Sequence, residues 1–241
     1  MTKARGFTLF EMVIATVVLS IIMIGIGSYI AIGVKGYTNT VDRERLQSQA
    51  RFLVARMTKE IRHAAPNSLS ASGSCLSFYP IIAPAVYYAN LPNNSSSIAI
   101  SPFNYSTSWE NKNNLVAVGF ASFEQYQNNT IKVSGITKPA NANEPYLLSL
   151  SSPITTTSPG KRLYLYKDKI SYCQNGKTIV RKVNDEFEGV LMADNIDTFT
   201  PEVQSAGLNS SAIALFSIQY LDQRTQEKSD YNHSVQVMNV L

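Results

Sequence analysis

The sequence predicts an α+β protein in which one long N-terminal helix, first membrane-spanning and then amphipathic, packs on a β-rich globular head. Three observations support this fold. An uncharged apolar run extends from Met12 to Val34, helical periodicity continues to about residue 65, and short alternating segments follow from Asn67 onward. The chain has 241 residues, which is enough for one membrane segment and one soluble domain with its own core.

Residues 7–34 form the apolar part of the predicted helix. The charge-free run holds about 23 residues, which as a helix is roughly 34 Å long and can cross the hydrocarbon core of a bilayer. The leader, residues 1–6, carries Lys3 and Arg5, and its charge favours a cytoplasmic N-terminus. A cleavable secretory signal is the alternative, but the run is longer than the apolar region of such a signal, which has about 7–15 residues.

Glu11 is the anomaly of this segment. It directly precedes the uncharged apolar run. Insertion of an ionised acid near the middle of a membrane costs about 2.5 to 3.5 kcal/mol on insertion scales. Such an acid needs either a partner or a route to the membrane surface. We therefore interpret Glu11 as a functional residue, and a chance acid that reaches the interface is the alternative.

Residues 35–65 continue the helix with an amphipathic pattern. Apolar side chains recur at steps of three or four, and mostly basic side chains occupy the positions between them. The apolar stripe, which we expect to pack on the head, consists of Leu46, Ala50, Leu53, Val54, Met57, Ile61 and Ala64. Pro66 disfavours the helical conformation at Ala65, so the helix is expected to end there.

Residues 66–241 are predicted to form the β-rich head. The strand candidates are Leu76–Ile82, Leu115–Phe120, Ile131–Val133, Tyr146–Leu150, Leu163–Tyr166, Ile170–Cys173, Thr178–Val183, Ile213–Leu221 and a last segment, Ser234–Val240. Two segments, Asn93–Ser97 and Ser151–Gly160, have the polar composition of loops.

The clearest local unit of the head is a hairpin. The pair Asn175-Gly176, flanked by alternating residues, is the strongest short signal for a hairpin turn. A two-residue loop at this pair is expected to set Tyr172 opposite Ile179 and Cys173 opposite Thr178.

Cys75 and Cys173 are the two cysteines of the chain, and they match no metal-ligand spacing. In an exported domain an even pair suggests one disulfide, which stabilises a fold by about 2 to 4 kcal/mol. Two buried free thiols are the alternative.

Composition and motifs argue against catalysis and against nucleic-acid binding. The first 65 residues carry nine basic and four acidic side chains, a net charge of +5, whereas the rest of the chain carries −1, so the head has little attraction for nucleic acid. The motifs of common hydrolases, zinc enzymes and thiol oxidoreductases are missing from the sequence. We expect no enzyme activity, cofactor or metal; calcium binding by the acidic run 185–188 together with Asp194 and Asp197 is the alternative.

The segment Gly6-Phe7-Thr8-Leu9-Phe10-Glu11, with its basic leader and apolar run, resembles the N-terminus of type IV pilins and pseudopilins. The resemblance implies that a prepilin peptidase cleaves between Gly6 and Phe7 and N-methylates Phe7, and that Glu11 is the family's assembly carboxylate. It further implies a pilin-like fold. The precursor would cross the inner membrane once with its head in the periplasm, and would then join a pilus fibre beside other major and minor pilins.

The chemistry of Glu11 agrees with this resemblance. In a stacked fibre its carboxylate can meet the Phe7 amine of a neighbouring subunit. At about 4 Å and an effective dielectric constant near 20, the attraction is on the order of 4 kcal/mol. This is comparable with the cost of keeping the acid among lipids, so pairing would favour the assembled state.

Internal stretches narrow the resemblance to minor components of such fibres. Residues 51–62 are similar to larger minor pilins and to J-type pseudopilins of type II secretion, whereas residues 75–81, 171–173 and 235–240 resemble minor pilin-like proteins of the mannose-sensitive haemagglutinin (MSHA) pilus. The expected function is therefore a minor pilin or pseudopilin in the assembly of an MSHA-like type IV pilus. A J-like pseudopilin of a type II secretion system and a glycan-binding pilus tip adhesin that uses Trp109 or exposed tyrosines are the alternatives.

Overall fold

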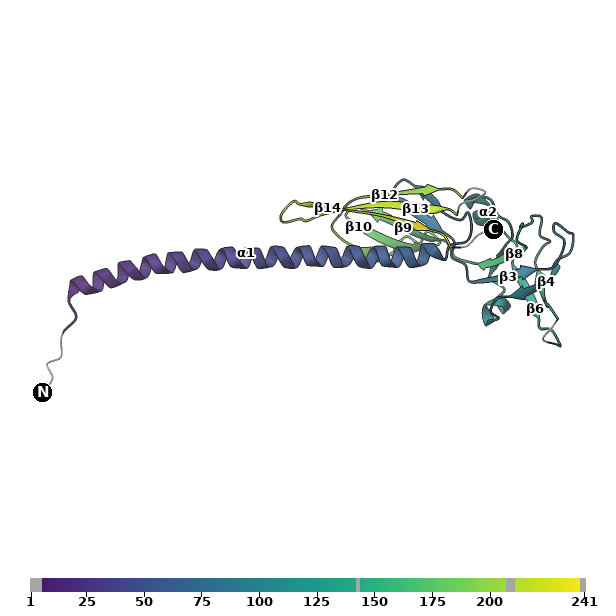
Figure 1. Ribbon diagram of the computed structural model, residues 1–241, viewed down its shortest axis with the longest axis horizontal. Helices are drawn as coiled ribbons and strands as arrows, with labels where there is room; N and C mark the ends of the chain where they lie inside the picture. Colours follow the sequence, from purple (N-terminus) through teal and green to yellow (C-terminus); the bar gives the residue numbers. More distant parts are fainter. Residues whose placement is uncertain (1–5, 142–143, 207–210, 239–241) are drawn as a thin grey trace. The chain divides into compact units, whose positions relative to one another are not determined.

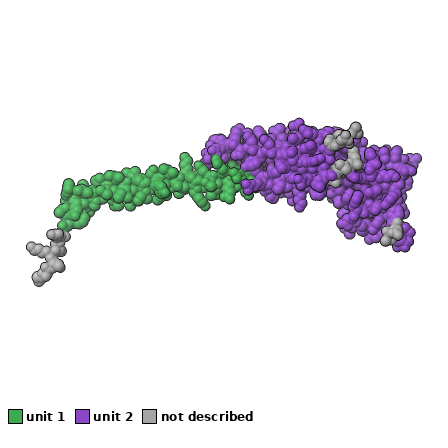
Figure 2. Space-filling model, in the orientation of Figure 1, with its two compact units in different colours: residues 1–48 green, residues 49–241 purple. Residues whose placement is uncertain are grey.

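The computed structural model describes residues 6–141, 144–206 and 211–238. The chain divides into two compact units, residues 1–48 and residues 49–241 (Figure 2). Helix α1 (Leu9–Arg62) begins in the first unit and ends in the second. The charged leader residues Lys3 and Arg5, and the end of the predicted last strand at residues 239–240, lie outside the described residues.

The first unit consists mainly of the apolar part of α1. An 18-residue window of this helix has a mean hydropathy of 2.5, and none of it is buried. By length and composition the helix can cross a membrane. A continuous apolar surface of this size is unfavourable in water, so this part of the helix requires lipid or other apolar helices around it.

In the second unit, the C-terminal part of α1 buries one face. The predicted apolar stripe is confirmed, because its buried members are Ala50, Leu53, Met57, Ile61 and Ala64. Val54, also a stripe residue of this unit, is half-buried. The helix ends at Arg62, slightly before the predicted position, because the chain leaves the helix to pair Ala64 with Pro80 in an isolated β-bridge.

The first sheet of the head is antiparallel and has the strand order β1-β2-β9-β10-β11, of which Figure 1 labels β9 and β10. Its strands are β1 (Ser70–Ser72), β2 (Cys75–Phe78), β9 (Ile170–Asn175), β10 (Thr178–Val183) and β11 (Val190–Ala193). Strands β2 and β9 are far apart in the sequence, and their register sets Cys75 opposite Cys173 and Leu76 opposite Tyr172. The middle of this sheet therefore depends on a long-range pairing.

The hairpin of β9 and β10 is present, but its loop differs from the predicted one. Gly176 and Lys177 form the loop, since Asn175 already pairs with Thr178. Gly176 has a φ of +59°, whereas Lys177 has no positive φ. Glycine with positive φ at the first central position is typical of a type II′ turn, rather than of the type I′ turn that Asn-Gly favours. The two expected strand pairs are therefore wrong, and the observed pairs are Tyr172–Arg181 and Cys173–Val180.

The second sheet is antiparallel, with β13 in the middle. Its strands are β12 (Ile196–Gln204), β13 (Ile213–Leu221) and β14 (Lys228–Gln236). Every second residue of β13 is buried, as its sequence predicted. The last strand was predicted too late in the chain. It begins at Lys228 because the whole of β13 pairs with it, from Leu221 opposite Lys228 to Ile213 opposite Gln236.

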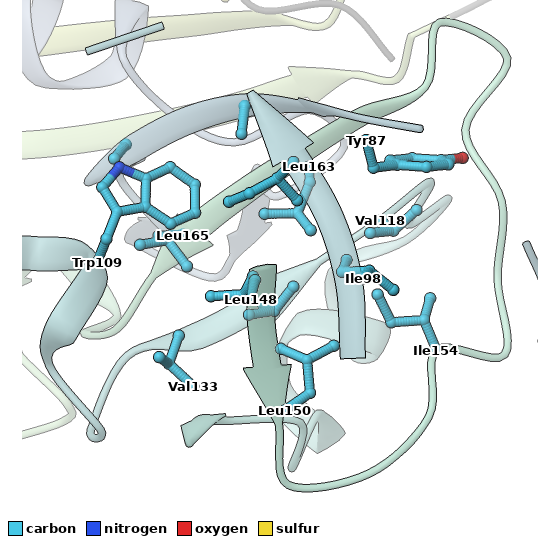
Figure 3. Packing of buried hydrophobic residues seen from close by; sticks show 14 residues of the cluster. Tyr87, Ile98, Trp109, Val118, Val133, Leu148, Leu150, Ile154, Leu163 and Leu165 are labelled. Atoms are coloured by element: carbon cyan, nitrogen blue, oxygen red, sulfur yellow. The ribbon is translucent and has the colours of Figure 1, made fainter. Parts of the chain in front are cut away.

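The third sheet is also antiparallel and has the order β5-β8-β3-β4-β7-β6. Its strands are β3 (Ala83–Tyr87), β4 (Ser97–Pro102), β5 (Leu115–Ala117), β6 (Val133–Thr137), β7 (Tyr146–Leu150) and β8 (Arg162–Tyr166). One core cluster lies on this sheet. Figure 3 shows Ile98, Leu148 and Leu163 converging there, with Trp109 from the short helix η1 (Thr107–Glu110) at one side.

A second core cluster is aromatic and surrounds the short helix α2 (Phe123–Asn128). The rings of Tyr126 and Tyr166 meet edge to face, with 5.1 Å between their centroids, and Tyr79 stacks on Tyr126 at 5.7 Å. The Tyr126 hydroxyl donates a 2.6 Å hydrogen bond to the carbonyl of Pro66. This cluster therefore attaches α2 to the segment that follows α1.

Candidate functional site

Helix α1 begins with a reciprocal interaction between Thr8 and Glu11. The Thr8 hydroxyl oxygen accepts a hydrogen bond from the backbone N–H of Glu11 at 3.3 Å. The Glu11 carboxylate in turn accepts hydrogen bonds from the Thr8 N–H at 3.5 Å and the Thr8 hydroxyl at 3.4 Å. This arrangement is a capping box, which satisfies backbone N–H groups at the start of the helix. We did not predict it, although Thr-x-x-Glu before an apolar run is its sequence signal.

Beyond this capping box, Glu11 has no ionic partner within the described residues. The carboxylate lies on an exposed face of α1 whose next members are Ile14, Ala15 and Val18. No salt bridge in the described part of the chain includes Glu11. A carboxylate among apolar side chains favours a cation. The Glu11 carboxylate can therefore form an ion pair with a cation that lies outside the described part of its own chain.

The residues before the helix are accessible. Gly6, Phe7 and Thr8 have no regular secondary structure, and the Phe7 side chain is 73% exposed. A Cβ atom added to Gly6 would meet no atom within 4 Å. Packing within the chain therefore does not require glycine at this position, and the Gly6–Phe7 peptide bond is open to an enzyme.

Glu60 connects α1 to the five-stranded sheet. Its carboxylate pairs with the guanidinium groups of Arg56 at 2.6 Å and Arg181 at 3.0 Å, and it accepts a 3.0 Å hydrogen bond from the Tyr172 hydroxyl. The Glu60 and Arg181 side chains are only 15% and 20% exposed. Burial, and then the nearby Glu60 carboxylate, raise the pKa of the Tyr172 hydroxyl. We did not predict this cluster, because its members come from three different elements.

Strand β14 makes a further connection to α1. The Thr58 hydroxyl and the His233 ring nitrogen Nε2 lie 3.1 Å apart, within hydrogen-bonding distance. The backbone N–H of Met238 then donates to the carbonyl of Arg62 at 3.1 Å. In addition to the Glu60 cluster, α1 is therefore bonded to the C-terminal part of the chain at Thr58 and at Arg62.

The predicted disulfide between Cys75 and Cys173 is present. The two cysteines are directly opposite each other in the β2–β9 pair. The strands of the six-stranded sheet, β3 to β8, lie between them in the sequence. The disulfide therefore joins the two points at which this sheet is inserted into the five-stranded sheet.

Two residues of the alternative binding sites are engaged within the head itself. Trp109 is fully buried in the core of the six-stranded sheet and cannot present its ring to a glycan. In the acidic run, Asp185 pairs with Lys169. No group of three His, Cys, Asp or Glu side chains in the described ranges is arranged to hold a metal ion.

The comparison with known families points to the N-terminus. The prokaryotic N-terminal methylation motif matches residues 1–27 of the chain. Neither the curated proteins nor the solved structures include a match to this chain. The matched motif is that of type IV pilins and pseudopilins. This motif precedes a long apolar helix that continues onto an antiparallel β-rich head, so the architecture of the chain is pilin-like.

In the family that this motif marks, a prepilin peptidase processes the chain at the motif, and the partners are other pilins. The apolar helix agrees with a location in the inner membrane or in a pilus. The identification rests on the first part of the chain. Features that are specific to this subunit are therefore expected in the head, residues 66–241.

Proposed function

We propose that this chain is a minor pilin or pseudopilin that takes part in the assembly of an MSHA-like type IV pilus. The observation that carries the proposal is the methylation motif at residues 1–27, which overlaps the start of a long apolar helix; the 18-residue window of highest hydropathy in this helix is not buried. The MSHA assignment rests on the resemblance of residues 75–81, 171–173 and 235–240 to minor pilin-like proteins of that pilus. Residues 1–6 would be the leader, 7–34 the membrane and fibre-core helix, 35–65 its amphipathic continuation and 66–241 the head.

In the proposed mechanism, processing prepares the subunit for assembly. The peptidase cleaves the accessible Gly6–Phe7 bond and methylates the new N-terminal amine of Phe7. The Glu11 carboxylate, which has no cation within the described part of its own chain, then pairs with the Phe7 amine of a neighbouring subunit. At about 4 Å this pairing is worth on the order of 4 kcal/mol in a medium with an effective dielectric constant near 20. It favours the fibre over the isolated subunit in the membrane.

Processing is tested by coexpression of the precursor with a prepilin peptidase, followed by mass spectrometry of the N-terminus. The expected product begins with N-methylated Phe7. Gly6→Val should block cleavage without disturbing the fold, because a side chain at this position meets open space. A mature protein that begins elsewhere, or that retains Gly6, would overturn the proposal.

The role of Glu11 is tested by incorporation into purified fibres. Glu11→Gln removes the negative charge, whereas the matched variant Thr8→Val weakens the capping box and leaves the charge in place. If the carboxylate pairs between subunits, incorporation falls more than tenfold for Glu11→Gln and much less for Thr8→Val. Equal losses would assign Glu11 to helix capping alone and refute the intersubunit pairing.

The particular fibre system is tested by the partners. Cross-linking in the native cell, followed by identification of the linked peptides, should connect this head to MSHA-type pilins. Links to the pseudopilins of a type II secretion system instead would assign the chain to that system. Both outcomes are compatible with processing at Phe7, so the two tests are independent.

A further inference from the structure

The six-stranded sheet has an inner and an outer face. On the inner face, buried residues such as Ile98 of β4, Leu148 of β7 and Leu163 of β8 form the core cluster of Figure 3. Side chains alternate between the two faces along a strand, so the residues next to these three point outward. The outer face therefore consists of every second residue of each strand.

The aromatic cluster around α2 covers one part of the outer face. Tyr166 of β8 and Ala117 of β5 point to this side and are buried in that cluster. Pro84 of β3 lies directly opposite Tyr164 of β8, so the outer face continues from the covered strands onto β3. The chain therefore covers β5 and β8 with a helix and its flanking aromatic rings.

Over β3, β4 and β7, the outward side chains are mostly apolar. We call six of them the apolar patch: Pro84, Val86, Tyr88, Ala99, Phe103 and Leu147. Two of the six follow directly after a strand, and their backbone N–H groups bond to the carbonyls of Ala99 and Pro84, which keeps them in the sheet. The large side chains Tyr88, Phe103 and Leu147 are 58%, 68% and 47% exposed.

The apolar patch departs from the usual pattern of an antiparallel sheet, in which the face turned to solvent is polar. Among the outward residues of β3, β4, β7 and β8, Arg162 alone is charged, and it lies opposite Val86 at the border of the patch. A contiguous exposed apolar surface on a folded head is typical of an interaction site.

The dimensions of the patch suit a helix. Three strands about 4.8 Å apart are roughly 10 Å across, and the distance along β3 from Pro84 to Tyr88 is about 13 Å. An α-helix is about 10 Å wide and rises about 5.4 Å per turn, so two to three turns cover the patch. The neighbouring part of the same face already accepts α2 in this way.

We propose that the apolar patch binds an amphipathic helix of a partner protein. A partner strand finds no free edge here, because β3 and β4 are paired on both sides. The positive charge of Arg162 at the border favours a helix whose apolar stripe has a carboxylate beside it. A second copy of the chain is disfavoured as the partner, since the apolar stripe of α1 is already buried against its own head.

The first test uses a designed peptide and the full chain in lipid vesicles. The peptide is a stapled helix of about 14 residues, with Leu at every third or fourth position and Glu beside this stripe. A scrambled peptide of the same composition has no stripe, and empty vesicles give the background. Fluorescence anisotropy should show binding of the amphipathic peptide, and binding at least about tenfold weaker for the scrambled one.

Variants of the head then locate the binding surface. Tyr88→Ser and Leu147→Asn should each weaken binding about tenfold, since each removes an exposed apolar contact. Leu191→Asn, at an exposed apolar position of β11, is the matched control and should leave binding unchanged. Replacement of the peptide's Glu by Lys should weaken binding about threefold, because Lys would approach Arg162. Unchanged thermal unfolding of each variant shows that the fold is intact.

The second test identifies the partner in the native cell. A photoreactive benzoylphenylalanine replaces Leu147 in the full chain, and Leu191 in the control. Mass spectrometry of the cross-linked peptides should join position 147, but not position 191, to a segment of another protein. This segment should have apolar residues at helical spacing and an acidic residue beside them.

Four results would overturn the proposal. They are equal binding of the amphipathic and scrambled peptides, equal effects of Leu147→Asn and Leu191→Asn, cross-links from position 147 to a second copy of this chain, and cross-links to a segment without helical periodicity. The inference does not depend on the fibre system proposed above. None of these outcomes bears on processing at Phe7 or on Glu11, so its failure is distinct from that of the proposed function.

Discussion

Cys75 and Cys173 face each other across the β2–β9 pair and are joined by a disulfide. Their separation of 98 residues in the sequence includes strands β3 to β8. One covalent bond therefore closes the loop from which the six-stranded sheet is built. Because the cross-linked segment is long, the bond removes a large amount of conformational entropy from the unfolded chain.

Reduction of this disulfide should lower the free energy of unfolding by about 2 to 5 kcal/mol, as the loss of a native disulfide usually does. The measurement is urea unfolding of the full chain in detergent, with and without reductant. Reductant should not affect the double variant Cys75→Ala/Cys173→Ala, which controls for other effects of the reagent. An unfolding midpoint that is the same in both conditions for the native chain would contradict the prediction.

Replacement of Glu60 should weaken the attachment of α1 to the head. Glu60→Gln leaves the largely buried guanidinium of Arg181 without its carboxylate and weakens the bond from Tyr172. We expect a loss of about 1 to 3 kcal/mol, below the cost for a fully buried pair because solvent reaches part of the cluster. Glu188→Gln, at an exposed position, is the matched control. Equal unfolding midpoints for the two variants would show that the cluster contributes nothing.

The head should lose stability at alkaline pH because of four tyrosines. Burial raises the pKa of Tyr126, Tyr166, Tyr172 and Tyr220 in the folded chain above the ordinary value of 10.0. The folded state therefore holds these protons more tightly than the unfolded state does. The resulting stability is fully present below pH 10.0 and is lost as the pH rises above it toward the folded values. Urea unfolding midpoints that stay constant from about pH 9 to about pH 11.5 would contradict this prediction.

Tyr220→Phe separates this effect from other alkaline effects. The Tyr220 hydroxyl is buried and has no hydrogen-bond partner among the described residues, so its removal should be neutral or should stabilise the head by up to about 1 kcal/mol at neutral pH. The variant should also show a smaller loss of stability above pH 10, because it has one shifted group fewer. A large destabilisation at neutral pH would mean that the hydroxyl has a partner after all.

Gly119 should tolerate no side chain. Its φ is +59°, and an added Cβ would lie 1.9 Å from the carbonyl oxygen of Thr157. Gly119→Ala should therefore cost more than about 3 kcal/mol or prevent folding. Gly176→Ala has the same positive φ but open space, and should cost about 1 kcal/mol. Gly135→Ala has open space and no positive φ, and should change the unfolding midpoint little. A similar cost at all three positions would contradict the steric argument.

The strands predicted best are those whose own side chains alternate or form a continuous apolar run. Tyr146–Leu150, Thr178–Val183 and Ile213–Leu221 coincide with β7, β10 and β13. The strands that were missed depend on their neighbours. Pro84 in β3 and Pro102 at the end of β4 argue locally against strands, yet both elements are paired on two sides. Strand β14 begins in a polar stretch that only its pairing with β13 orders.

The N-terminal features were accessible from sequence because they are contiguous. The methylation motif, the apolar run and the stripe on α1 depend on residues a few positions apart, which a helix or a peptidase recognises locally. The sequence suggested a disulfide only because it contains two cysteines. The register of β2 and β9, which sets Cys75 opposite Cys173, is what allows the bond to form. The turn at Gly176 shows the limit of local signals, since strand pairing placed the loop one residue later than the Asn-Gly pair indicates.

The Glu60 cluster is a product of tertiary structure alone. Glu60, Tyr172 and Arg181 come from three elements, α1, β9 and β10. Their side chains meet only when the head is folded, because folding must first close long loops of the chain at a cost in conformational entropy. Sequence therefore established that this chain has a pilin-like N-terminus and a helix followed by strands. Packing of distant segments decided how the C-terminal part of α1 is held and how the strands of the head are paired.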